Sequence, residues 1–475
     1  MADGTWKMEN IKLIKKALSV LTGLTIFLSL ASPVSAHAFG KLYNLPVPFW
    51  MYLFGSAATL IVSFLIIGYF LTKNGEEVAY PKIRIPVLHL SMKKLPIGIA
   101  KSISIFLFSL TILTGLIGTD SSYFNFNMTF FWIFLVLGTT YLTALIGNVW
   151  TIINPWKILA EAFECISKKE IKGIITYPEN FTYYPALITY FLFIWIELFA
   201  NTTPFSLSLL LVQYSFLSLF GIFIFGKNTW LMYGEFFSVF FRLLSNLAPL
   251  EFKKNKFFLR PPFIGLIEKN TNHFSLLVFI LFMLSSTAFD GIRETVPFAN
   301  FYWQFFLTIP YAPFQTIALL ASPFIFLSIY WILIILTKLI TRSKRSVKDL
   351  AFAFAPSLIP IALVYNIAHY YTLLLTQGQE IIRLASNPFG WNWNLFNTIN
   401  FTPNLQIIDA NITWHSQVAF ILTGHIAAVY LAHLIALRLF PSRKKALLSQ
   451  FPMLILMVIY TMIGLWILSQ PITSG

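Results

Sequence analysis

The chain has 475 residues, of which 57% are hydrophobic and only 11% are charged. Because soluble domains carry roughly 25% charged residues, this composition excludes a soluble globular protein of this size. The formal net charge is +15, but the basic residues fall in short loops between long apolar runs, which indicates membrane orientation rather than nucleic-acid binding. The single cysteine, Cys165, excludes a disulfide framework and any CxxC motif.

Residues 1–36 have the pattern of a secretory signal peptide. Lys12, Lys15 and Lys16 precede an apolar run that ends in "PVSA", and we expect cleavage after this motif; the alternative is an uncleaved first helix. Cleavage would leave His37 at the mature amino terminus. A terminal histidine offers both its amine and its imidazole nitrogen to Cu(II), so His37 is a candidate copper ligand.

Ten apolar segments after the signal are long enough to span a bilayer. Residues 37–475 are therefore predicted to form a single all-α, polytopic transmembrane helical bundle, with the lipid bilayer as its surroundings. The predicted spans lie near 47–72, 98–118, 127–150, 183–201, 205–226, 272–290, 314–341, 348–376, 416–438 and 450–471.

A further apolar segment near 230–250 is interrupted by Glu235 and Arg242. Its two flanks, Lys227 and the basic stretch 251–260, both have cytoplasmic character. A segment that begins and ends on one side of the membrane does not cross it, so we expect a re-entrant or interfacial helix here.

If the segment near 230–250 does not cross the membrane, nearly all basic residues fall on one side of it. The predicted cytoplasmic side takes 26 Lys and Arg of the mature chain, and the outer side takes three: Lys41, Arg293 and Arg383. By the positive-inside rule the protein lies in the cell (plasma or inner) membrane with both mature termini outside the cytoplasm. The longest outer segment, 377–415, is rich in Trp, Asn, Pro and Gly, which favours an ordered extracytoplasmic cap.

Polar side chains gather in the eighth span. Asn366, His369 and Tyr370 have spacings of three and four, so they share one helix face, and that face must point into the bundle or a watery cavity. Two interpretations stay open. The trio forms a satisfied interhelical hydrogen-bond network, or it supplies a ligand or general base, as a catalytic group, at the floor of an outward-facing pocket.

The ninth span contains His415, His425 and His433. They are separated by ten and eight residues, or roughly 15 and 12 Å along a helix, so no two of them share a metal without ligands from other helices. We expect a metal site, for zinc or copper, to combine His369 and Asp290 with one histidine of this helix, either His415 or His425. Haem held by His369 and His425 is a further alternative.

Acidic side chains also flank apolar runs on the outer side. Glu197 lies near the outer end of the fourth span, and Asp290 ends the sixth. Six acids face three bases on this side of the membrane. We therefore expect the outer surface to favour cations.

Several long strings have an unusual composition: "GNVWTIINPW" (147–156), "GKNTWLMYGEFFSVFFRL" (226–243), "RPP" (260–262), "STAFDG" (286–291), "NIAHY" (366–370), "SNPFGWNW" (386–393), "GHIAAVYLAH" (424–433) and "SQFPMLILMVIYTMIGLWILSQPI" (449–472). In these strings the chain resembles the bacterial and archaeal membrane-protein family named fenitrothion hydrolase. The likeness covers nearly the whole mature chain.

The resemblance implies hydrolysis of an organophosphate triester, and hence a hydrophobic small-molecule substrate. Such chemistry needs an activated water, commonly on a metal, and stabilisation of charge at the phosphoryl oxygen. His369, His415, His425 and Asp290 are the ligands we expect to serve it. The alternatives are a transporter or metal-handling component whose polar face binds cations, and a membrane subunit that anchors an extracytoplasmic partner through the 377–415 cap.

Overall fold

The computed structural model describes residues 48–70, 82–84, 94–253, 256–267, 272–306, 308–440 and 442–470. The predicted signal peptide, its cleavage point and His37 lie outside these residues.

The ten predicted spans are confirmed, because ten helical segments of the described chain are long and apolar enough to cross a membrane. They are α2 (Phe49–Phe70), α3 (Lys94–Ile117), α4 (Phe126–Thr129) continued by the π-helix η2 (Phe130–Gly138) and α5 (Thr139–Ile146), η3 (Glu179–Phe181) with α8 (Tyr184–Phe199), α9 (Pro204–Phe225), α12 (Phe274–Arg293), α14 (Tyr311–Thr341), α15 (Val347–Phe354) continued by η5 (Ala355–Leu358) and α16 (Ile359–Leu375), α18 (Ala410–Leu439) and α19 (Arg443–Ser469).

Short elements connect these spans: α6 (Trp150–Ile153), α7 (Pro155–Ser167), α10 (Lys227–Tyr233), α11 (Phe236–Ser245), η4 (Ile264–Leu266), α13 (Val296–Phe305), η6 (Gln377–Gln379) and α17 (Glu380–Ser386). One small antiparallel sheet, not expected from the sequence, joins β1 (Ile83–Arg84), β3 (Lys256–Leu259) and β2 (Leu250–Lys253) in that order. The all-α class is confirmed, with this sheet as a minor addition at the side predicted to face the cytoplasm.

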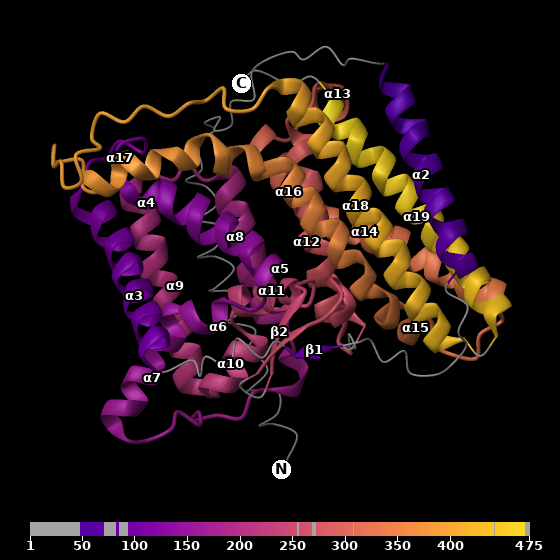
Figure 1. Cartoon of the computed structure of the whole chain (residues 1–475), viewed down its shortest axis with the longest axis horizontal. Coiled ribbons are helices and arrows are strands. Elements are labelled where there is room, and N and C mark those ends of the chain that lie inside the picture. The colour runs from indigo at the N-terminus through magenta and orange to yellow at the C-terminus, as the bar shows by residue number, and fades with distance from the viewer. Residues whose placement is uncertain are drawn as a thin grey trace.

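The helices form two packed groups, seen at the left and right of Figure 1. One group pairs α3 with α9 around α4–η2–α5, and the other packs α2, α12, α14, α16, α18 and α19. Contacts of α8 with α12 and of η2 with α16 join the two groups. The candidate site described below lies at this junction.

The outer segment after α16 is held against the rest of the protein by hydrogen bonds. Thr119 N donates to the Phe389 carbonyl at 2.8 Å, and Phe126 N donates to the Pro388 carbonyl at 3.1 Å. The ninth span begins earlier than expected, at Ala410, because Asp409 accepts a hydrogen bond from the Asn411 amide and caps the helix.

The segment predicted not to cross the membrane is divided into α10 and α11. The longer of the two, α11, has ten residues and is about 15 Å long at 1.5 Å per residue. The hydrocarbon core of a bilayer is about 30 Å thick, so α11 cannot span it. Instead its apolar face, which includes Phe236, Phe237 and Phe241, is buried in the bundle.

Glu235 caps the buried beginning of α11. Its carboxylate accepts hydrogen bonds from the amides of Phe237 (3.0 Å) and Ser238 (2.8 Å), the Ser238 hydroxyl (2.5 Å), the Tyr214 hydroxyl (2.6 Å) and the Asn154 amide nitrogen (3.3 Å). A negative charge is favourable at a helix N-terminus, where backbone amides lack partners. Glu235 therefore stabilises an otherwise unsatisfied helix end.

Arg260 has the opposite role at the other end of α11. Its guanidinium donates to the carbonyls of Ala248 at 3.1 Å, Ser245 at 3.3 Å and Asn246 at 3.4 Å, and its side chain is only 5% exposed. Ser245 is the last residue of α11, Asn246 is its C-cap and Ala248 follows, so Arg260 supplies donors to carbonyls at and just beyond the helix end. Both ends of the short helix are thus satisfied by buried charged side chains.

We expect Glu235→Ala to lower the free energy of unfolding by about 3 kcal/mol, because a buried donor left without a partner costs about 1–3 kcal/mol. The measurement is thermal unfolding in detergent, followed by tryptophan fluorescence. Glu170→Ala, at an exposed position, is the matched control and should change little. Equal melting temperatures for Glu235→Ala and the control would contradict this role of Glu235.

A second prediction concerns the ion pair between Glu164 on α7 and Lys227 on α10. Hydrogen bonds from Lys227 and from the Ile171 amide hold the pKa of Glu164 below its usual value of 4.5. A lowered folded-state pKa stabilises the fold above the unfolded-state pKa, and this stabilisation is lost as pH falls through the folded-state pKa. We expect Glu164→Gln to lower the melting temperature at pH 7, with the difference shrinking below about pH 4.5. A pH-independent difference would show that charge is not its cause.

Candidate functional site

The most buried of the ten spans, α12, carries an acid and a base one turn apart near its predicted outer end. Asp290 is 3% exposed and Arg293 is 9% exposed, and Arg293 Nε donates to Asp290 Oδ1 at 3.1 Å. A charge in a membrane span is costly unless it is paired. Asp290 and Arg293 form such a pair within one helix.

Two side chains of α16 meet the other oxygen of the same carboxylate. Tyr370 OH donates to Asp290 Oδ2 at 2.5 Å, and His369 Nε2 lies 2.9 Å from that oxygen. Tyr370 is buried, whereas the His369 side chain is 18% exposed. Asp290 therefore lies between a buried hydroxyl and an imidazole that reaches toward the surface.

Arg293 also binds the end of a third helix. Its Nη1 donates to the Leu198 carbonyl near the end of α8 at 2.9 Å, and its Nη2 lies 3.0 Å from Glu294 Oε1. Burial raises the pKa of Glu294, which follows the span. The cluster of Asp290, Arg293, His369 and Tyr370 thus connects α8, α12 and α16.

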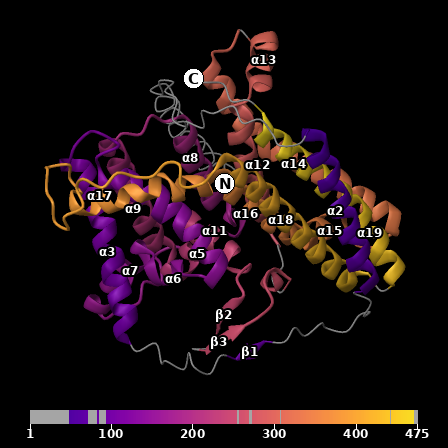
Figure 2. The same ribbon diagram turned by 45° about the horizontal axis from the view of Figure 1, so that its top comes forward.

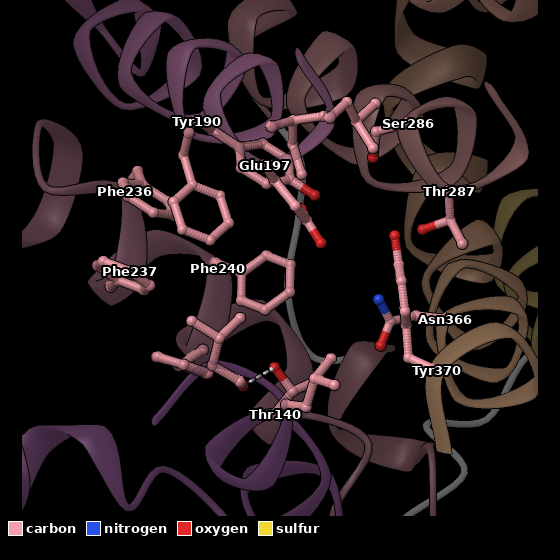
Figure 3. Close-up of a pocket in the computed structure, with 16 residues that line it drawn as sticks. Thr140, Tyr190, Glu197, Phe236, Phe237, Phe240, Ser286, Thr287, Asn366 and Tyr370 are labelled. Atoms are coloured by element: carbon pink, nitrogen blue, oxygen red, sulfur yellow. Dashed lines mark hydrogen bonds between the residues drawn. The ribbon is translucent and has the colours of Figure 1, made fainter. Parts of the chain in front are cut away.

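A cavity of about 40 Å³ adjoins this cluster (Figure 3). Around it the close-up shows Glu197 of α8 facing Thr287 of α12 and Asn366 and Tyr370 of α16. Aromatic rings of α8 and α11 close the remaining walls, including Tyr190, Phe236 and Phe240. The wall is thus apolar on one side and polar on the other.

The π-helix η2 contributes Val136 and Leu137 to the wall. A π-helix of nine residues is unusual, since most π-helical segments are single turns, and they occur frequently at functional sites.

Some polar atoms at the cavity have no hydrogen-bond partner within the described chain. They are Ser286 Oγ and Asn366 Oδ1, both from residues that line the cavity. One water needs roughly 10–15 Å³ of such space and two or more polar partners. A cavity of this size therefore accommodates about three waters, which would satisfy these atoms.

The three residues predicted to share a face of the eighth span are divided between two environments. Asn366 and Tyr370 line the cavity, whereas His369 turns to Asp290 and toward the surface. The polar groups follow one another in space from His369 to Asp290, to Tyr370 and to the cavity opposite Glu197. A catalytic role for the trio stays a prediction.

The histidines of α18 do not join this cluster. His415 is exposed, and its ring nitrogens lie 2.8 Å from the Asn411 carbonyl and 3.3 Å from Tyr52 OH. His425 is 1% exposed, and its Nδ1 lies 2.8 Å from the Ile421 carbonyl one turn earlier. Within the described part of the chain, no three His, Cys, Asp or Glu side chains are placed to share a metal ion. Of the expected metal ligands that lie in the described residues, only His369 and Asp290 are brought together.

No protein-family model, curated protein or solved structure matches this chain. The function is therefore inferred from the geometry of the site.

Arg293 is the residue of the cluster that the sequence did not single out. In "DGIR" the acid and base are separated by three residues at the end of an apolar helix. This spacing places them on one face, so the pair could have been found. The cavity wall formed by η2 and α11 has no comparable signal, because it depends on the packing of helices distant in sequence.

We expect Arg293→Gln to lower the free energy of unfolding by about 3–5 kcal/mol, the cost of removing one partner of a buried ion pair. The double variant Asp290→Asn/Arg293→Gln should be more stable than Arg293→Gln alone, because the buried Asp290 charge that would lack its partner is also removed. The measurement is a double-mutant cycle of thermal unfolding in detergent. Strictly additive losses would show that the two side chains do not act as a pair.

Proposed function

We propose that the protein is a membrane transport protein whose Asp290 binds a proton and exchanges it between the predicted outer surface and the inner cavity. The observation that carries this proposal is the shared carboxylate oxygen, Asp290 Oδ2, which lies within hydrogen-bond distance of both His369 and Tyr370. Carboxylate and imidazole groups in series within membrane spans are typical of proton relays in pumps and transporters.

Each group in the series has the chemistry that the relay needs. Histidine changes charge between pH 5 and 8, and its two ring nitrogens let it take a proton on one side and give it up on the other. His369 would accept a proton at Nδ1 and release the Nε2 proton to Asp290 Oδ2. Tyr370 would then pass its hydroxyl proton to a cavity water or to Glu197 and take the proton from Asp290, so Asp290 and Tyr370 return to their initial forms. His369 is left with its proton on Nδ1 and returns to its initial tautomer by exchanging protons with water, and a proton taken by Glu197 passes on to the cavity waters.

The size of the cavity supports a proton rather than an organic molecule as the species held there. Pockets for drug-sized ligands have volumes of about 300–1,000 Å³, whereas this cavity has about 40 Å³. An aryl phosphotriester does not fit in it. A few waters do, and these could carry a proton between Tyr370 and Glu197.

The test uses proteoliposomes that contain a pH-sensitive dye and carry an imposed potassium diffusion potential. We expect the wild type to acidify the lumen when the potential drives protons inward, and Asp290→Asn or Tyr370→Phe to reduce the rate at least tenfold. Asp120→Asn, at an exposed position on the same predicted side, should keep the wild-type rate. Equal rates for Asp290→Asn and wild type would overturn the proposal.

A second candidate function is hydrolysis of an organophosphate ester, in line with the resemblance to the fenitrothion hydrolase family. The observation that favours it is the His369–Asp290 pair, because a carboxylate that orients an imidazole is the arrangement of a general base. His369 Nδ1 makes no hydrogen bond within the described chain, so it could activate a water at the surface.

For this candidate we expect release of a nitrophenol from an aryl phosphotriester, lost in His369→Gln and kept in His415→Gln, which alters an exposed imidazole at the same predicted side. The measurement is absorbance of the phenolate with protein in detergent, and unchanged thermal unfolding shows that each variant folds. Turnover that survives His369→Gln would exclude this residue as the base.

A further inference from the structure

A second charged feature lies at the opposite, predicted cytoplasmic, end of the bundle. Six exposed basic side chains occur at the end of α14, in the loop to α15 and in the first turns of α15 and α19. We refer to them as the α14/α19 basic cluster: Arg342, Lys344, Arg345, Lys348, Lys444 and Lys445.

The two halves of the cluster are about a hundred residues apart in sequence, but helix packing brings them to one level. Helices α14 and α19 run antiparallel and pack together, and Thr337 Oγ1 donates to the Ser449 carbonyl at 3.3 Å. Arg342 follows Thr337 by five residues, and Lys444 precedes Ser449 by five. Both therefore lie about 7.5 Å beyond this contact, at 1.5 Å per residue. The ends of α14, α19 and α2 lie together at the right of Figure 1.

The positive charge of the cluster is only partly compensated, by Asp349, which interacts with Arg345 and Lys348. None of its six side chains forms an ion pair within the described residues. The acid nearest in sequence, Asp349, is engaged in the capping box of α15 with Ser346. By contrast, Lys101 and Lys227 at this side are paired with acids, since Lys101 lies 2.6 Å from Glu161 and Lys227 binds Glu164.

Exposed apolar side chains in the last turns of α14 indicate where the cluster lies relative to the bilayer. Leu336, Leu339 and Ile340 are 40%, 65% and 46% exposed on the surface of α14. Exposed Leu and Ile on a membrane span contact acyl chains, and the basic residues one turn further lie at the level of the lipid headgroups. The surface thus offers apolar contact and positive charge in the order in which a phospholipid presents its tails and its phosphate.

We propose that the α14/α19 basic cluster binds the headgroup phosphate of an anionic phospholipid, whose acyl chains lie against α14. Lys and Arg clusters next to a span attract anionic lipid. The position of the cluster favours a lipid over a nucleic acid, because the charge lies at the rim of exposed apolar surface. This inference is independent of the proton relay.

A residue next to the cluster contacts the first span. Arg443, next to Lys444, donates from Nη2 to the carbonyls of Gly68 at 3.1 Å and Tyr69 at 3.4 Å, at the end of α2. A lipid bound here would lie beside the ends of α2, α14 and α19. We therefore expect its binding to raise the thermal stability of the protein.

The test compares the full chain with the variant Lys344→Gln/Arg345→Gln/Lys444→Gln/Lys445→Gln. The matched control, Lys168→Gln/Lys169→Gln/Lys172→Gln, removes exposed charges from another predicted cytoplasmic loop. Each protein in detergent is titrated with phosphatidylglycerol, phosphatidylcholine or inorganic phosphate, and the melting temperature and the lipids retained in native mass spectrometry are recorded.

We expect phosphatidylglycerol to raise the melting temperature of wild type and control, and phosphatidylcholine and inorganic phosphate to have much smaller effects. The fourfold variant should melt as wild type does in phosphatidylcholine but bind phosphatidylglycerol up to roughly a thousandfold more weakly, since four basic residues near the surface each contribute to anionic-lipid attraction. Equal stabilisation by the two lipids, or phosphatidylglycerol binding that the fourfold variant retains, would overturn the proposal.

Discussion

Most of this structure follows from one constraint, that a charge placed in a membrane span must be paired and hydrogen-bonded. Asp290 and Arg293 lie on the most buried span, α12, where water does not stabilise their charges. Each is satisfied by the other and by groups of neighbouring helices, namely His369 and Tyr370 for the acid and the Leu198 carbonyl for the base. The relative positions of α8, α12 and α16 at their predicted outer ends are therefore set by one ion pair.

Glu235 at the start of α11 is also a buried charge that needs partners, but its partners differ from those of Asp290. This difference distinguishes a charge with a structural role from one with a candidate functional role. Glu235 accepts five hydrogen bonds, two of them from the backbone amides of the helix that it caps. These five donors are amides and hydroxyls, which do not change charge near neutral pH. Asp290 instead contacts the imidazole of His369, whose two ring nitrogens can take up a proton on one side and release one on the other, and its second partner, Tyr370, adjoins a cavity with room for water. This is why we assign the chemistry to Asp290 and a capping role to Glu235.

Sequence reasoning recovered the features that depend on periodicity and on charge. The ten spans follow from apolar length, and the non-crossing segment near 230–250 follows from the basic flanks at both its ends. It also singled out Asp290, His369 and Tyr370, because polar side chains are rare in such spans. It could not find the cavity, since η2, α8, α11 and α16 meet only through packing. It also expected His425 to turn toward other helices, whereas the imidazole binds the carbonyl one turn earlier in its own helix, a local partner that every helix offers.

The hydrogen bond from Arg293 to the Leu198 carbonyl has a further consequence. The strength with which Asp290 holds the guanidinium depends on whether its carboxylate carries a proton, and the same guanidinium holds the end of α8. Proton occupancy and the position of α8 are thus two sides of one coupled equilibrium. Thermodynamic reciprocity then requires that anything which displaces α8 also changes the proton affinity of the carboxylate, by the same free energy.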